Sequence, residues 1–246
     1  MSAVEDKRNV MKSGFGVREI DSDQKKGAPL PPFEKPVPEG ARLVDLPKPK
    51  KEVVTKAHIY DCVNDRKSRR RFTSESLTLD ELAYLLWATQ GVREVVPGAR
   101  AYRTVPSAGC RHPFDTYLAV TRVQGLEPGI YRYLAMSHQL ALIEAAPDIE
   151  SRVAAASGSM TWIASAPVVF VWAVTPYRSE WRYAGEAQRL MLLDAGHVCQ
   201  NLYLAAESIG CGTCAIGAFP QAEIDAMFGL DGKDEFVVYC APVGKV

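Results

Sequence analysis

The sequence predicts an α+β protein built around one core. Patterns typical of helices and of strands both occur, but they do not alternate regularly along the chain, which argues against a doubly wound parallel sheet. No internal repeat is visible. The 246 residues, of which 47% are hydrophobic, suit one sizeable core better than two.

The charge balance favours a small-molecule substrate and excludes nucleic acid as a partner. The 29 Lys and Arg residues equal the 29 Asp and Glu residues, so no basic surface for nucleic acid is expected. Residues 1–23 contain no apolar signal-peptide core. The most apolar stretch, Ala166–Val174, is too short to cross a membrane and is typical of a buried strand. Six irregularly spaced cysteines, expected to be reduced, indicate a cytoplasmic protein.

Residues 1–50 are predicted to be an N-terminal leader or arm, and residues 51–246 the folded domain. Prolines are dense over residues 29–49, which excludes helix and favours extended or polyproline conformation. Two interpretations stay open: a disordered leader, or an ordered arm. An ordered arm could bury side chains such as Phe33 and Leu46 against the body or a partner subunit.

The first clear helix is expected over Leu79–Gln90. Thr78 and Glu81 have the spacing of a capping box, in which each side chain binds a free amide of the first turn. Gly91 is a natural end. Further elements are expected at 115–121 (strand), 129–133 and 139–143 (a hairpin), 149–156 (helix), 168–174 (strand), 213–216 (strand), 221–227 (helix) and 235–240 (strand).

The longest helix is expected over Glu186–Ser208, with Gly210 closing it. Most of its surface is apolar, which is typical of a central, buried helix. Asp194, His197 and Asn201 lie at positions i, i+3 and i+7, so they share one face of this helix.

A run of cations around one hydroxyl, RKSRRR at residues 66–71, lies shortly before the capped helix. Arginine presents a rigid fork of donors to phosphate oxygens, and serine adds a neutral hydrogen bond. The run therefore suits a phosphate monoester. A solvated basic turn is the alternative interpretation.

Two segments of small residues are candidates for contact with a flat ring. Residues 105–109, VPSAG, build a tight turn whose backbone could approach a ring closely. Residues 210–219, GCGTCAIGAF, leave backbone amides free to face the edge of a ligand. The alternatives are a plain loop for the first segment and close packing of strand on helix for the second.

Together, the R-x-S-x-R, P-S-A-G and I-G-A-F segments resemble the FMN-dependent nitroreductase family, and most closely its SagB-type dehydrogenase branch. LLWATQGV, GLEPGIYRY, DAGHVCQNLYLAAESIG and APVGK add to this resemblance, which covers residues 58–246. It implies a nitroreductase-like fold with a mainly antiparallel central sheet flanked by helices. It also implies a homodimer in which the long helix lies at the interface.

The resemblance assigns a first set of residues to the phosphate end of FMN. Arg66, Ser68 and Arg70 match the positions that hold the phosphate and the ribityl chain. Lys245 lies near a C-terminal basic position that reaches the phosphate. These four residues are the predicted phosphate site.

A second set of residues is assigned to the flavin ring. Pro106, Ser107 and Ala108 match the turn that lies against the flavin of the other subunit. Ile216 and Gly217 match the backbone that hydrogen-bonds the reactive edge of the ring. These five residues are the predicted ring contacts.

The chain departs from the family pattern at one pair. Members that oxidise azoline rings in peptides carry a Lys-Tyr pair before the long helix, and the corresponding residues here are Arg182 and Tyr183. Arginine does not readily release a proton, so it is a poor general base. Tyr183 could still donate or accept one proton. These two residues are the candidate catalytic pair.

The activity implied is transfer of hydride or electrons between NADH or NADPH and a quinone, nitro compound or similar small acceptor, by a ping-pong mechanism on FMN. One alternative is a SagB-type dehydrogenase that oxidises azoline rings in a modified peptide. Another is a non-catalytic flavin-binding partner subunit. The third is a flavin-free α+β protein with a basic turn.

No metal site is expected. Cys211 and Cys214 have redox-motif spacing, but they lie at a strand entry, where positions three apart point to opposite faces. The four histidines show no metal-ligand spacing with one another or with nearby carboxylates.

Overall fold

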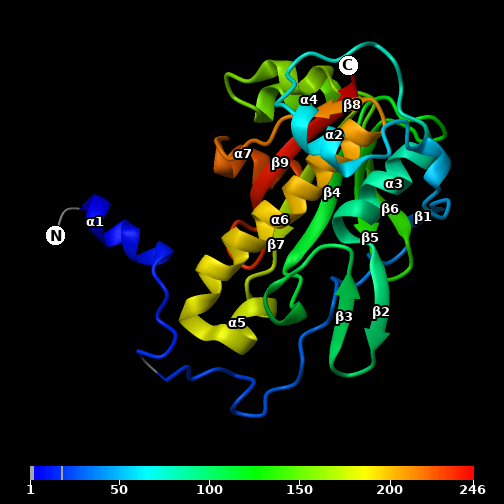
Figure 1. Ribbon diagram of the computed structural model, residues 1–246. Coiled ribbons are helices and arrows are strands. Elements are labelled where there is room, and N and C mark those ends of the chain that lie inside the picture. The colour runs from blue at the N-terminus through cyan, green and yellow to red at the C-terminus, as the bar shows by residue number, and fades with distance from the viewer. Residues whose placement is uncertain (1–2, 18) are drawn as a thin grey trace.

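The computed structural model describes residues 3–17 and 19–246. Seven strands form one sheet in the order β1-β6-β5-β4-β7-β9-β8, and β2 and β3 form a separate hairpin (Figure 1). The strands are β1 (Arg42–Asp45), β2 (Val92–Val96), β3 (Arg100–Arg103), β4 (Phe114–Val120), β5 (Gly129–Leu134), β6 (Gln139–Ala145), β7 (Val168–Val174), β8 (Cys211–Thr213) and β9 (Phe236–Lys245).

Every neighbouring pair in the sheet is antiparallel, which confirms the predicted α+β, nitroreductase-like fold. The predicted hairpin is present as β5 and β6. The apolar stretch predicted as a buried strand forms β7, which is buried along its whole length between β4 and β9. No helix of the described residues is long and apolar enough to cross a membrane.

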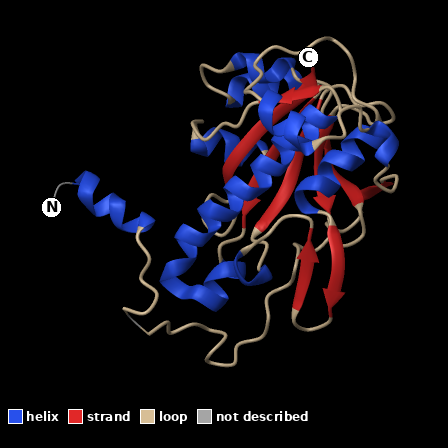
Figure 2. Ribbon diagram, viewed as in Figure 1, coloured by secondary structure: helices blue, strands red, loops and turns tan. Residues whose placement is uncertain are grey.

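Helices cover both faces of the sheet (Figure 2). One core contains residues of α3 and α6, packed against side chains such as Trp172 of β7. The other contains residues of α4 and α7, packed against the opposite side of the same strands. The helices are α1 (Ala3–Arg8), α2 (Ile59–Asp65), α3 (Leu79–Gln90), α4 (Ile149–Ala156), α5 (Tyr177–Tyr183), α6 (Ala187–Ser208) and α7 (Gln221–Met227).

The capped helix and the long helix form where the sequence predicts them. Thr78 Oγ1 accepts a hydrogen bond from the amide of Glu81, and the Glu81 carboxylate accepts one from the amide of Thr78. In α6 the face toward the sheet is buried, whereas Leu192 and Leu193 are 56% and 48% exposed. A large apolar surface on a helix that is otherwise packed marks a contact face.

The C-terminal strands differ from their predicted limits. A strand was expected at residues 213–216, but β8 covers Cys211–Thr213, and Ile216 makes only an isolated bridge to Cys240. The last strand was expected to end at Cys240, but β9 continues to Lys245. Pro242 lies inside β9 opposite Val169 of β7, and the pairing with β8 begins only at the next residue, Val243.

Part of the described N-terminal segment lies along the body, and the choice between a leader and an arm stays a prediction. β1 adds an edge strand to the sheet by pairing with β6. The buried Arg103 donates to the carbonyl of Phe33, and the buried Arg132 to the carbonyls of Lys35 and Pro36. α1 stands away from the rest of the body (Figure 1). The division of the chain at residue 50 stays a prediction.

Candidate functional site

The cationic segment lies beside β8. It follows α2 directly, and Ser68 forms a parallel bridge with Thr213 of β8, where the Arg69 amide donates to the Thr213 carbonyl over 2.9 Å. Ser68 and Arg70 are exposed, and Arg66 is half-buried. Residues 68–73 and Val246 line an open surface hollow of about 540 Å³.

Tyr203 of α6 joins this segment to the chain that follows β8. Its hydroxyl lies 2.8 Å from Ser68 Oγ and accepts a hydrogen bond of 2.8 Å from the Ala215 amide. The Arg66 guanidinium lies over the Tyr203 ring, 5.2 Å from its centre. Nothing in the sequence singles out Tyr203 as a site residue. The sequence gives one weak signal for Tyr203, a phenol near the end of an apolar helix.

The VPSAG turn is held at the other end of α6. Asp194 accepts hydrogen bonds from Ser107 Oγ over 2.5 Å and from the Ala108 amide over 3.1 Å. Burial raises the pKa of Asp194, while these two bonds act to lower it. Pro106 of this turn is exposed to solvent, while Asp194 fixes the turn through Ser107 and the Ala108 amide.

Arg182 and Tyr183 end α5 beside this same turn. A methyl group on Gly109 would lie 2.5 Å from Tyr183 Oη and 2.9 Å from Arg182 Cδ. Gly109 also has φ of 58°, a conformation that other residues rarely adopt. Arg111 donates to the Gly109 carbonyl and lies over the Trp181 ring. The candidate catalytic pair is therefore packed against the small-residue turn of its own chain.

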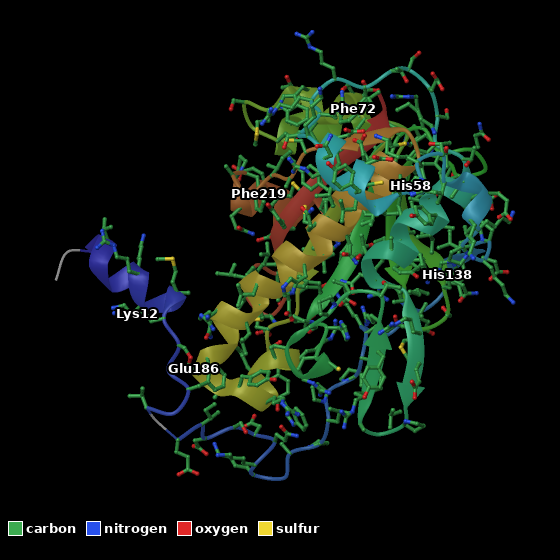
Figure 3. The ribbon with its side chains drawn as sticks, in the orientation of Figure 1. Lys12, His58, Phe72, His138, Glu186 and Phe219 are labelled. Atoms are coloured by element: carbon green, nitrogen blue, oxygen red, sulfur yellow. The ribbon has the colours of Figure 1, made fainter. Side chains whose placement is uncertain are left out.

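Within one chain the predicted residues form two groups at opposite ends of α6. Asp194 and Tyr203, which anchor them, are separated by about 13 Å along the helix. Figure 1 shows α5 at the lower end of α6 and α2 and β8 near its upper end. In Figure 3, Phe72, just after the cationic segment, and Glu186, just before α6, likewise lie far apart. The structure does not bring the VPSAG turn to the cationic segment of the same chain.

Of the three remaining predicted residues, Ile216 and Lys245 have hydrogen-bond partners inside the protein. The Ile216 amide donates to the Cys240 carbonyl over 2.8 Å, whereas Gly217 is exposed. The Lys245 ammonium donates to the Glu81 carboxylate, which also takes part in the α3 cap. Ile216 and Lys245 therefore have these groups occupied in the structure, and their roles stay predictions.

The cysteines and histidines show no arrangement suited to a metal. Within residues 3–17 and 19–246, no cluster of His, Cys, Asp and Glu side chains could hold a metal ion. Cys211 and Cys214 are both free and buried. Burial raises the pKa of Cys211 to about 12, so its reactive thiolate is disfavoured.

The fold and this arrangement define an α+β protein of the nitroreductase-like fold. The chain belongs to the nitroreductase family: the model of that family, described as "Nitroreductase family", matches residues 63–245. A protein of Methanocaldococcus jannaschii described as a candidate nitroreductase is 34% identical over 76% of this chain and 90% of its own length. The trifolitoxin-processing protein TfxB of Rhizobium leguminosarum bv. trifolii is 30% identical over 61% of this chain, but only 41% of TfxB is covered.

Solved structures share the fold at lower identity. A candidate nitroreductase of Anabaena variabilis matches 84% of this chain with a TM-score of 0.69 and 24% identity, and this match covers 42% of that protein. A chain of the E. coli microcin synthetase McbBCD complex, with truncated pro-MccB17 bound, matches 99% of this chain and 91% of its own length, with a TM-score of 0.61 and 16% identity. The NADPH:FMN oxidoreductase of Vibrio harveyi, complexed with NAD+, matches 76% of this chain and 68% of its own length, with a TM-score of 0.52 and 17% identity. Family membership supports an oxidoreductase, and the likeness to TfxB and the microcin synthetase is consistent with the SagB-type branch.

His112, directly behind the VPSAG turn, should make stability depend on pH. Burial, with the nearby charge of Arg103, lowers the pKa of His112 from 6.5 to about 3. As the pH falls between these values, only the unfolded chain binds the proton, so folding loses about 1.4 kcal/mol per pH unit. Relative to His112→Asn, the wild type should therefore lose free energy of unfolding as the solution is acidified below about pH 6.5.

Urea unfolding at a series of pH values measures this slope. His197→Asn is the matched control, because the His197 side chain is 51% exposed. Wild type and His112→Asn with the same dependence on pH would contradict the assignment of a neutral, buried His112.

Proposed function

We propose that this protein is an FMN-dependent oxidoreductase that passes electrons from NADH or NADPH to a quinone, nitro compound or similar small acceptor. The observation that carries the proposal is the placement of the cationic segment. Arg66 and Ser68 lie against the strand that leads to the exposed backbone of Gly217, and Tyr203 contacts both parts. Tyr203 thus joins the proposed phosphate donors to the chain that leads to Gly217.

The side chains at this surface suit a phosphate ester. Arg66, Ser68 and Arg70 offer two guanidinium groups and a hydroxyl from alternate positions of one extended segment. Two neighbouring buried atoms, Arg69 Nε and Thr213 Oγ1, have no hydrogen-bond partner among the residues that the structure describes. Buried polar atoms are rarely left without a partner, so they are consistent with a ligand or ordered water nearby.

The ring end of the proposed site would use backbone rather than side chains. Since the Ile216 amide is bonded to Cys240, Gly217 is the better candidate of the two to donate to the ring edge. When bound, FMN would supply the hydride and electron chemistry, while the protein positions it and its partners. The same pocket would receive the nicotinamide and the acceptor in turn, which gives ping-pong kinetics.

A homodimer would complete this site. The turn at residues 106–108 is anchored to α6 at Asp194 and the cationic segment at Tyr203, so the two lie apart on one chain. A two-fold dimer in which the α6 helices run antiparallel would bring the partner's turn to this end. The exposed Leu192 and Leu193 give α6 an apolar surface for such a contact.

Arg182 and Tyr183 would reach the flavin of the partner subunit together with that turn. A permanent guanidinium charge there would favour an anionic substrate group or the anionic reduced state of the ring system. Tyr183 could exchange one proton with the substrate. This chemistry suits a quinone or nitro compound, which gains negative charge as it is reduced.

The likeness to TfxB and to the microcin synthetase chain favours a second candidate function, oxidation of azoline rings in a modified peptide. Arg182 in place of lysine argues against it, because arginine is a poor proton acceptor. A third candidate is a flavin-binding partner subunit without activity of its own. Reduction of the flavin band by a nicotinamide and its return with an acceptor would separate an enzyme from such a subunit.

Removal of a phosphate contact should weaken FMN selectively. Arg66→Ala and Arg70→Ala each remove a charge-assisted contact worth about 1.5–3 kcal/mol, so FMN affinity should fall at least about tenfold. Riboflavin, which lacks the phosphate, should lose much less. Fluorescence titration measures both, and Lys67→Ala controls for loss of charge in the same segment. Equal losses for both flavins would contradict the phosphate assignment.

Sedimentation should detect a dimer that depends on α6. Leu193→Glu places a charge on the exposed apolar surface of the helix, so it should shift the protein toward monomer and release flavin. Val95→Glu is the matched control, because Val95 is 40% exposed on β2, away from this helix. A wild-type protein that sediments as a stable, flavin-loaded monomer would rule the dimer out.

The Arg182 side chain should affect turnover rather than cofactor binding. Arg182→Ala should slow reduction of a quinone or nitroaromatic by reduced nicotinamide while the bound FMN is retained, because the phosphate residues are untouched. Arg182→Lys keeps a positive charge and should preserve more of the rate. Steady-state kinetics and the flavin absorbance report the two effects. A wild-type protein that converts a thiazoline peptide to a thiazole would favour the peptide alternative instead.

A further inference from the structure

Tyr203 contacts three separate parts of the candidate site through one side chain. Tyr203 as a whole residue is 8% exposed, and its ring lies under the Arg66 guanidinium. Its hydroxyl contacts Ser68 from the cationic segment and Ala215 from the chain that follows β8. Arg66 and Ser68 belong to the proposed phosphate site, and Ala215 precedes the proposed ring contact at Gly217 by two positions.

The direction of one of the two hydrogen bonds follows from the donors available. The Ala215 amide can only donate, so the Tyr203 hydroxyl oxygen accepts from it. The phenol proton remains available for Ser68 Oγ, 2.8 Å away, although either hydroxyl can be the donor in this second bond. When Tyr203 donates, Ser68 keeps its own hydroxyl proton for an outside acceptor, such as a phosphate oxygen, in the hollow at the cationic segment.

The ring of Tyr203 acts on the neighbouring arginine. A guanidinium over an aromatic face is attracted by the negative potential of that face. Arg66 lies over this ring and, among the described residues, makes no ion pair with an Asp or Glu that would neutralise its charge. Such an arginine stays available to an anionic ligand.

We infer that Tyr203 is a positioning residue that couples the phosphate end of the flavin site to its ring end. This inference rests on the proposed FMN function. The hydroxyl fixes Ser68 against Ala215, and the ring fixes Arg66, so the distance between the phosphate donors and the Gly217 backbone is set before a cofactor binds. Loss of the hydroxyl should disturb both ends, whereas loss of Ser68 should disturb only the phosphate end.

The test compares Tyr203→Phe, which keeps the ring and removes the hydroxyl, with Ser68→Ala. FMN and riboflavin affinities are measured by fluorescence titration, and the midpoint potential of bound FMN by dye-coupled reduction. Tyr203→Phe should weaken FMN roughly fivefold to tenfold. It should also make the potential more negative, because the amide donors near the ring edge are displaced. Ser68→Ala should weaken FMN and leave the potential unchanged.

Two further variants complete the experiment. Tyr84→Phe is the matched control, because the Tyr84 hydroxyl also bonds a serine hydroxyl, Ser208, and contacts the same helix. It should leave both readouts as in the wild type. Because Ser68 is oriented through Tyr203, the double variant Ser68→Ala with Tyr203→Phe should bind FMN more tightly than the two single losses multiplied together predict.

The outcomes distinguish the inference from the proposal on which it rests. If wild-type protein binds FMN but Tyr203→Phe behaves as Tyr84→Phe, or the losses multiply independently with no change in potential, the positioning role is wrong and the flavin function stands. If wild-type protein binds no flavin, both fail. Circular dichroism of each variant identifies any loss of folding. The exposed Ser68 gives a second test of the phosphate end that does not depend on a core substitution.

Discussion

The packing of α6 across the antiparallel sheet is the constraint on which the rest of the site depends. Its buried face packs into the core around Trp172, so the helix cannot shift along the sheet without exposing apolar surface. Two polar side chains of α6 then bind loops at fixed positions along the helix. Asp194 hydrogen-bonds the VPSAG turn, and the Tyr203 hydroxyl contacts Ser68 of the cationic segment. The length of helix between them sets the separation of the two loops.

The separation of the two loops along α6 places different chemical groups at the two ends of the candidate site. The end at Tyr203 gathers the Arg66 guanidinium and the Ser68 hydroxyl, which suit an anionic cofactor. The end at Asp194 gathers a tight turn with Arg182 and Tyr183 packed against it, which suits a planar substrate and a proton exchange. A dimer with antiparallel α6 helices would superpose one half from each chain, so the exposed leucines and the divided site are two consequences of one arrangement.

Hydrogen bonds from buried side chains also hold the segment before residue 50 against the body. Buried Arg103 and Arg132 donate to carbonyls of the extended, proline-rich segment, which has few amides of its own to offer a sheet. Closer to α6, the Gly14 amide donates to Glu186, and Phe15 packs edge-on against Tyr183. Residues 14 and 15 therefore lie beside the candidate catalytic pair.

The sequence by itself determined the elements whose signals are local. Thr78 and Glu81 set the start of α3, the apolar run set β7, and the apolar length of α6 indicated a buried helix, because capping and burial patterns depend on residues close in sequence. The order of the R-x-S-x-R, P-S-A-G and I-G-A-F segments indicated the family. Only the tertiary structure decided that β8 begins at Cys211, that Ile216 and Lys245 are already bonded, and that Tyr203 contacts Ser68 and Ala215. These features depend on partners far away in sequence, such as Cys240 for Ile216 and Glu81 for Lys245, and no local pattern encodes a distant partner.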